Sequence, residues 1–344
     1  MGTPEKLSRS ARRAIPGIAL AIGVCVGWLV KDFFAAESRA GGLEIHEQSH
    51  YSFINPLLEC EVDAGESDAK TMLQLEKRIE SIIENKRESG RVSRVSVYFR
   101  DLKQGHWYGI NELDVFEPAS LVKVPLMMLY FKIAERHPGL LREELAFQGV
   151  HDLNRSRAFN SSENIVPGRV YTVEELIHNM IVHSDNNAYS LLRRKLDPRL
   201  LDKMLAELGI SAKYLEGEDR MPLKAYAAFF RVLYNATYLN RDYSEKALSI
   251  LKDVTFSEGI EAGLPPGTKF ANKFGERSTG TDAPVRQLHD CGIVYHPQHP
   301  YLLCIMTRGS DFQSLKDTLR EISRAAYEEV GHGSFPVAAS AAPW

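Results

Sequence analysis

The sequence predicts an α+β fold in which one antiparallel five-stranded sheet is split by an insertion of helices. Three observations predict it. An amphipathic helix and two strand-like segments come first, a mostly helical stretch follows from about 119 to 252, and three strand-like segments and a last amphipathic helix complete the chain. Because few strands lie within the helical stretch, the strands on its two sides are expected to pair with each other.

The first half of the sheet is predicted by residues 71–111. Residues 71–89 carry apolar side chains near helical spacing, and Gly90 ends the helix. Residues 92–102 alternate between apolar and polar side chains, and residues 105–111 follow after a short turn. These two segments are expected to form a β-hairpin.

The rest of the fold is predicted by the helical stretch and by the strands after it. Apolar side chains at helical spacing predict helices at 122–136, 172–185, 187–196, 198–209 and 222–237. Strands are expected at 268–277, 289–296 and 301–309, and the last helix at 311–330. The predicted sheet domain is therefore discontinuous, 67–118 with 256–330, around a helical domain at 119–255. Residues 331–344 are expected to be a disordered tail.

Two of the four cysteines, Cys291 and Cys304, fall on neighbouring predicted strands and could face each other. A buried pair of free thiols is expected here, because a free cysteine behaves as a small core residue, and a disulfide is the alternative. Four cysteines are too few for a disulfide-based scaffold and lack the spacing of a zinc site.

The N-terminal segment is predicted to lie outside the fold. Residues 14–30 contain no charge, and they follow Lys6, Arg9, Arg12 and Arg13. An uncleaved membrane anchor is expected, with a cleaved signal peptide or a buried core helix as alternatives. The basic flank keeps the N-terminus in the cytoplasm and the domain outside it. Residues 1–31 therefore read as the anchor and 32–66 as a linker.

Composition excludes several classes of protein. The chain has 344 residues, 44% of them hydrophobic, with 42 Lys and Arg against 45 Asp and Glu. This balance is that of an ordinary globular protein, not of a basic nucleic-acid binder. We expect a monomer, and no cofactor is expected. No metal is expected either, since no cluster of metal-ligating residues is apparent.

Three Ser-x-x-Lys patterns occur, at Ser67, Ser120 and Ser249, and their contexts differ. Ser120 stands where an apolar helix begins, and Lys123 lies among apolar residues on the same helix face. Desolvation lowers the pKa of a lysine, and a neutral amine can take the proton of a serine hydroxyl. Taken alone, the pattern also fits a serine that caps a helix and a lysine that reaches solvent.

Two further motifs follow in order along the chain. Ser184, Asp185 and Asn186 form a Ser-Asp-Asn sequence in a loop between two helices, which by itself also fits a helix cap. Lys273, Phe274 and Gly275 lie on the first strand after the helical stretch.

The three motifs together resemble those of the penicillin-recognising serine hydrolases, most closely the class A β-lactamases and their relatives. The resemblance covers about residues 67–330 and implies a β-lactamase/transpeptidase-like fold. It implies that Ser120 is the acylated nucleophile, Lys123 a base and Ser184 a proton shuttle. Lys273 would hold the substrate carboxylate and Asn186 the acyl amide. The backbone around Gly275 and Glu276 would bind the substrate, with the N–H groups of Ser120 and Glu276 as the oxyanion hole.

The sequence departs from this family in two places. Phe274 replaces the hydroxyl residue between the Lys and Gly of the third motif. No Glu-x-x-Leu-Asn loop follows the Ser-Asp-Asn motif, so the glutamate that activates water for deacylation is missing. Glu216, Glu218 and Asp219 are the nearest acids and one could replace it, although an acidic turn in solvent is the favoured interpretation of each. His289 is expected to be structural rather than catalytic.

Three functions remain open. The first is hydrolysis of β-lactams through an acyl-enzyme at Ser120, with slow deacylation. The second is carboxypeptidase- or esterase-like chemistry on cell-wall D-Ala peptides. The third is a non-catalytic binding module at the cell surface. The intact set of serines, lysines and asparagine favours an enzyme, and the first function is the nominal one.

Overall fold

The computed structural model describes residues 43–46, 51–61, 66–149, 151–159, 161, 163–211, 221–280 and 284–332. It confirms the predicted α+β fold with one five-stranded antiparallel sheet, in the order β4-β3-β11-β10-β9. The strands are β3 (Val92–Asp101), β4 (Trp107–Ile110), β9 (Phe270–Thr279), β10 (Val285–Val294) and β11 (Tyr301–Gly309). Strands from both sides of the helical stretch therefore share the sheet, since β11 pairs with β3.

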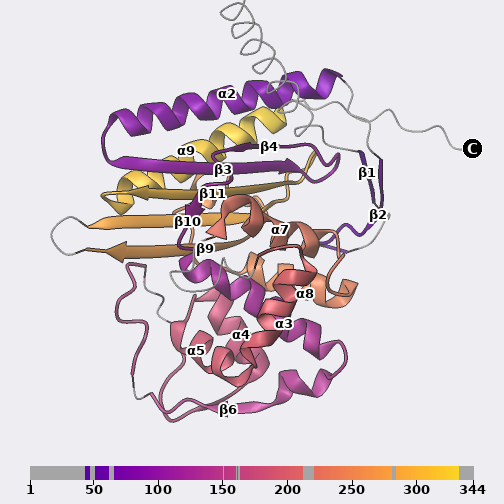
Figure 1. The fold of residues 1–344 in the computed structure, drawn as a ribbon, viewed down its shortest axis with the longest axis vertical. Coiled ribbons are helices and arrows are strands. Elements are labelled where there is room, and N and C mark those ends of the chain that lie inside the picture. The colour runs from indigo at the N-terminus through magenta and orange to yellow at the C-terminus, as the bar shows by residue number, and fades with distance from the viewer. Residues whose placement is uncertain are drawn as a thin grey trace, which may run out of the picture.

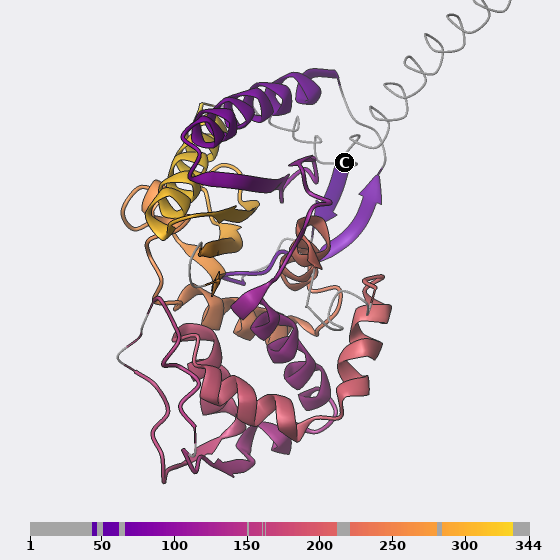
Figure 2. The ribbon, with the colours of Figure 1, turned by 60° about the vertical axis from the view of Figure 1, so that its left-hand side comes forward.

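Helices cover both faces of this sheet (Figures 1 and 2). The N-terminal helix α2 (Glu66–Glu88) and the C-terminal helix α9 (Phe312–Gly331) lie side by side on one face. Helix α7 (Leu223–Tyr234) packs on the other face against β3 and β11. Because both faces are covered, β11 is buried along almost its whole length and shows no alternation between apolar and polar residues.

The remaining helices gather beyond the edge strand β9 (Figure 1). They are α3 (Lys123–Ala134), α4 (Val173–Val182), α5 (Asn186–Lys195), α6 (Pro198–Glu207) and α8 (Arg241–Lys252). Helix α3 is buried nearly all round, which explains its apolar sequence without a polar face. Helix α8 was not given separate bounds by the sequence pattern, and it packs against β9.

Three small two-stranded sheets were not predicted. They pair β1 (Leu43–His46) with β2 (Leu57–Glu61), β5 (Val115–Phe116) with β8 (Met221–Pro222), and β6 (Glu144–Ala146) with β7 (Val170–Thr172). The first of them lies within the segment expected to be a linker. Between its strands, the Glu245 carboxylate accepts the backbone N–H groups of Ser52, Phe53 and Ile54 at 2.8, 3.0 and 3.0 Å.

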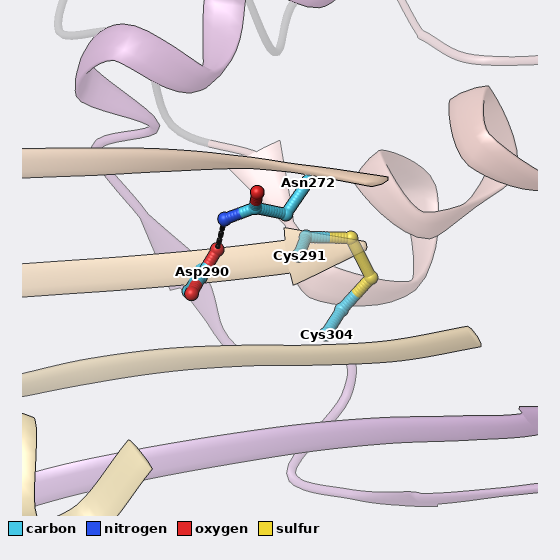
Figure 3. Close-up of a disulfide and its surroundings, with 4 residues drawn as sticks. All are labelled: Asn272, Asp290, Cys291 and Cys304. Atoms are coloured by element: carbon cyan, nitrogen blue, oxygen red, sulfur yellow. Dashed lines mark hydrogen bonds between the residues drawn. A yellow bond between two sulfur atoms is a disulfide. The ribbon is translucent and has the colours of Figure 1, made fainter. Parts of the chain in front are cut away.

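The expectation of free thiols at Cys291 and Cys304 is wrong, because the structure joins them in a disulfide (Figure 3). The two residues are direct partners in the register of β10 and β11, with 3.9 Å between their Cα atoms. The spacing of the strands along the chain did not reveal this register. In the same figure, Asn272 on β9 donates a hydrogen bond of 2.8 Å to the buried Asp290 on β10.

The predicted anchor at 14–30 and most of the predicted tail at 331–344 lie outside the described residues. Within the residues that the structure does describe, none of the helices combines the length and the apolar character needed to cross a membrane. The division into a sheet domain and a helical domain stays a prediction.

Candidate active site

Ser120 lies in a short 3-10 helix, Ala119–Val122, that leads directly into α3. Ala119 has a left-handed backbone with φ of 49°. The turn packs closely against β9, because a Cβ atom at Gly275 would lie 2.7 Å from the carbonyl oxygen of Pro118. Gly275 is thus required for the close approach of the third motif to the serine.

Lys123 points from the first turn of α3 into the site and is 1% exposed. Its Nζ donates to Ser120 Oγ at 3.0 Å, to the Ser184 carbonyl oxygen at 2.7 Å and to Asn186 Oδ1 at 2.7 Å, and it lies 3.2 Å from Ser184 Oγ. Burial, and then the neighbouring charge of Lys273, hold the pKa of Lys123 well below its ordinary value. The first two motifs are therefore joined through one amine.

Lys273 joins the third motif to the second. Its Nζ donates to Ser184 Oγ and to the Phe274 carbonyl oxygen, both at 3.0 Å. The side chain is fully buried, and this burial lowers the pKa of Lys273 to about 7. Ser184 has a left-handed backbone, with φ of 52°, and its hydroxyl lies between the two lysines.

Asp185 organises the loop of the second motif. It caps α5 by accepting the N–H groups of Asn187 and Ala188, and it also accepts Ile165 N–H and Asn154 Nδ2. The carboxylate is fully buried, so it acts on the loop and not on a substrate.

We expect Asp185→Ala to lower the free energy of unfolding by about 3 kcal/mol, because four buried donors lose their acceptor. Urea unfolding measures the change. Asp197→Ala is the matched control, since Asp197 caps α6 through Arg199 N–H at an exposed position. The control should lose about 1 kcal/mol. Equal losses in the two variants would contradict the organising role of Asp185.

The remaining residues of the predicted site lie around this centre. Asn186 Nδ2 donates to the Leu153 carbonyl oxygen at 3.0 Å. Glu276 lies on β9 two residues beyond Phe274, and its Oε1 accepts Ala158 N–H at 2.7 Å. Since β9 is the edge strand, alternate residues of β9 turn their N–H groups away from the sheet. An oxyanion hole made by the N–H groups of Ser120 and Glu276 stays a prediction.

Phe274 takes part in an aromatic cluster. Its ring stacks on Phe256 at 4.2 Å between centroids and meets Phe159 edge to face at 6.3 Å. The Nζ of Lys273 lies 4.2 Å from the centroid of the same ring. The three phenylalanines and Arg157 help to line a cavity of about 260 Å³. An apolar ring therefore stands where the resemblance places a hydroxyl group.

The segment 151–159 is the part of the site that sequence reasoning missed. Near its beginning it contacts α5, where Leu153 N–H donates to Asn187 Oδ1 at 2.9 Å. Near its end it contacts β9, where Ala158 N–H donates to Glu276 Oε1. Within it, Arg157 Nη2 donates to the His183 carbonyl oxygen at 2.8 Å. The segment has no periodic pattern, so only its richness in polar residues could have drawn attention to it.

Of the residues considered as the base that activates water for deacylation, the structure describes only His289. Glu216, Glu218 and Asp219 lie outside the described residues. His289 is fully buried: its Nε2 lies 3.0 Å from the Glu117 carbonyl oxygen, and its Nδ1 accepts Thr307 N–H. Burial lowers the pKa of His289 to about 4. These backbone contacts are those of a structural histidine.

The arrangement suits nucleophilic acyl transfer. A serine hydroxyl contacts a buried amine whose pKa is low, and a second serine bridges that amine to another lysine. Within the described residues, no group of three His, Cys, Asp or Glu side chains is placed to hold a metal ion.

Solved structures share the fold across three quarters of the chain. A β-lactamase from Xanthomonas campestris pv. campestris str. ATCC 33913 matches with a TM-score of 0.62 and 20% identity over 75% of this chain and 99% of its own. One from Chitinophaga pinensis DSM 2588 matches with a TM-score of 0.64 and 17% identity over the same shares. A point mutant of PBP-A, solved as an acyl-enzyme complex with penicillin G, matches with a TM-score of 0.62 and 21% identity over 76% and 97%.

A comparison with curated proteins finds no match. The model of the beta-lactamase enzyme family, in contrast, matches residues 74–330. This range contains all three motifs and every strand of the five-stranded sheet. The chain therefore belongs to the beta-lactamase enzyme family and is a serine hydrolase.

Proposed function

We propose that the protein forms an acyl-enzyme at Ser120 with β-lactams and hydrolyses that intermediate slowly. The contact of Lys123 Nζ with Ser120 Oγ, in a site that buries the amine, carries this proposal. A point mutant of one structural relative, PBP-A, was solved as an acyl-enzyme complex with penicillin G. The shared fold accommodates such an intermediate in that protein, which supports the same chemistry here.

The proposed acylation uses groups that are already in contact. Ser120 Oγ attacks the lactam carbonyl, and its proton passes to Lys123 Nζ. The ring C–N bond then breaks, and the leaving nitrogen takes a proton through Ser184 Oγ, which lies 3.2 Å from Lys123 Nζ. Lys273 stabilises the negative charge that passes over Ser184. Water must later break the ester and restore the Ser120 hydroxyl.

Intact mass spectrometry after incubation with penicillin G tests the proposal. The protein should gain the mass of one penicillin per chain, since ring opening loses no atoms. Ser120→Ala should abolish the gain. Ser249→Ala should not abolish it. Ser249 belongs to another of the three Ser-x-x-Lys sequences, but it lies on α8 and not at the start of α3 beside Lys123. An undiminished adduct on Ser120→Ala would refute the assignment of the nucleophile.

A second candidate function is release of D-Ala from cell-wall peptides, or related ester hydrolysis, through the same acyl-enzyme. Phe274 favours the ester substrate in particular, because the ring is 4% exposed, stacks on Phe256 and offers no hydroxyl to the carboxylate that a penicillin and a D-Ala peptide both carry. Release of D-Ala from a wall peptide, without any penicillin adduct, would favour this second function.

A further inference from the structure

Three basic side chains meet at two consecutive residues, His183 and Ser184, at the start of the Ser-Asp-Asn loop. The His183 carbonyl oxygen accepts Arg157 Nη2 at 2.8 Å, and the next carbonyl oxygen, of Ser184, accepts Lys123 Nζ at 2.7 Å. The Ser184 hydroxyl accepts Lys273 Nζ at 3.0 Å. The guanidinium and the two amines therefore contact the same two consecutive residues, His183 and Ser184.

The position of Arg157 is fixed from both ends of the segment 151–159. On one side Asn186 N–H donates to Asn154 Oδ1 at 2.8 Å. On the other side Ala158 N–H donates to Glu276 Oε1 at 2.7 Å, and the Phe159 ring contacts Phe274. The guanidinium is therefore carried into the site by a segment that is tied to α5 and to β9.

The other charged groups around the two amines are few. Lys123 faces Asp185 and Glu276, besides the other two cations, and Lys273 faces Asp290 and Glu276. The Tyr189 ring lies 6.0 Å from Lys123 Nζ. Asp185 already accepts four hydrogen bonds, and Asp290 accepts Asn272 Nδ2 and Ile260 N–H. These carboxylates favour the protonated amines and offset part of the effect of Arg157, whose charge disfavours them and acts on both lysines.

We propose that Arg157 is a positioning residue whose permanent charge keeps the buried pair, Lys123 and Lys273, from holding two protons at neutral pH. One amine is then free to take the proton of Ser120. The inference rests on the proposed function for its effect on acylation, although the charge state of the lysines is independent of any substrate. A guanidinium suits the task because it stays protonated where a third lysine would be protonated only in part.

The sign of the effect follows from electrostatics. A nearby positive charge disfavours the protonated amine, and both lysines have lowered pKa values to which Arg157 contributes after burial. Removing that charge raises the pKa of the amine that acts as base. The acidic limb of the pH profile for acylation should therefore move to higher pH in Arg157→Gln, by about one pH unit. Below the limb, acylation becomes about tenfold slower.

Two measurements test the proposal. The first is the rate of penicillin G adduct formation between pH 5 and 9, followed by mass spectrometry. The second is an NMR titration of protein labelled at lysine Cε, in which Lys123→Met and Lys273→Met identify the signals. Arg157→Gln should move the acidic limb of the acylation profile and the midpoint of the lysine titration to higher pH together. In Arg157→Lys both quantities should lie between those of the original protein and those of Arg157→Gln.

Arg155→Gln is the matched control, because Arg155 lies in the same segment with an 85% exposed side chain. It removes the same charge and should move neither quantity. Unmoved lysine titrations in Arg157→Gln, in a variant that still unfolds cooperatively, would overturn the proposal. So would a weaker affinity for penicillin with an unmoved limb, which would make Arg157 a substrate-binding residue. Shifted titrations without any adduct would support the role of Arg157 and refute acylation.

Discussion

Replacing Lys123 by methionine should slow acylation of Ser120 by about 10²–10⁴-fold, the usual contribution of a positioned general base. Methionine has nearly the same volume as lysine, so the buried space stays filled. The lost amine is the group that contacts both Ser120 Oγ and Ser184 Oγ, and no other described side chain takes both contacts. Time-resolved mass spectrometry of the penicillin adduct measures the change.

Lys132→Met provides the control for the Lys123 variant. Lys132 lies on the same helix, but its Nζ binds Glu135 and the Tyr238 carbonyl oxygen outside the site. The control should acylate at the original rate. If Lys123→Met also acylated at that rate, Lys273 would have to take the proton of Ser120 through Ser184, and the assignment of the base would be wrong.

The acyl-enzyme is expected to accumulate during turnover, because deacylation lacks the family's glutamate. Losing general-base help should slow this step by about 10²–10⁴-fold, whereas acylation keeps Lys123. Nitrocefin should therefore give a burst of about one product per site followed by a slow steady state. Stopped-flow absorbance measures the burst, and Ser120→Ala gives the background hydrolysis.

Two of the described groups near the site, Glu276 and His289, agree with slow deacylation. Glu276 Oε1 is occupied by Ala158 N–H, and His289 is held by the backbone on both ring nitrogens. Turnover without a burst at about 10 s⁻¹ or more, with no adduct in the mass spectrum, would contradict the prediction. Glu216, Glu218 and Asp219 would then be the first positions to replace.

The sheet could be predicted from the sequence because its signals are local. Alternation in 92–102 and the continuous apolar run in 301–309 mark strands wherever they pair. Ser120 and Lys123 could be paired in the same way, since they stand three residues apart at a helix start. The meeting of Ser184 with Lys273 came instead from the resemblance to a family, because no local pattern joins residues 89 positions apart.

Arg157 and the disulfide show what local patterns leave out. Arg157 belongs to a polar segment without periodicity, and its neighbour Ala158 contacts Glu276 across 118 positions. The spacing of Cys291 and Cys304 put them on adjacent strands, but only the register makes them direct partners. In both cases the deciding contact depends on how separate elements are packed, which composition and spacing do not encode.

Lys273, which completes the site, comes from β9, near the end of the folded part of the chain. The site can therefore form only after β9 has joined the sheet. Until β9 joins the sheet, Lys273 is far from Ser184, and Lys123 is not sealed from water by the loop around Ser184. Ser120 is then an ordinary alcohol beside an ordinary ammonium group. Under the proposed acylation at Ser120, reactivity should appear only in the folded molecule, so a covalent label on Ser120 should count correctly folded chains and leave out incomplete or misfolded ones.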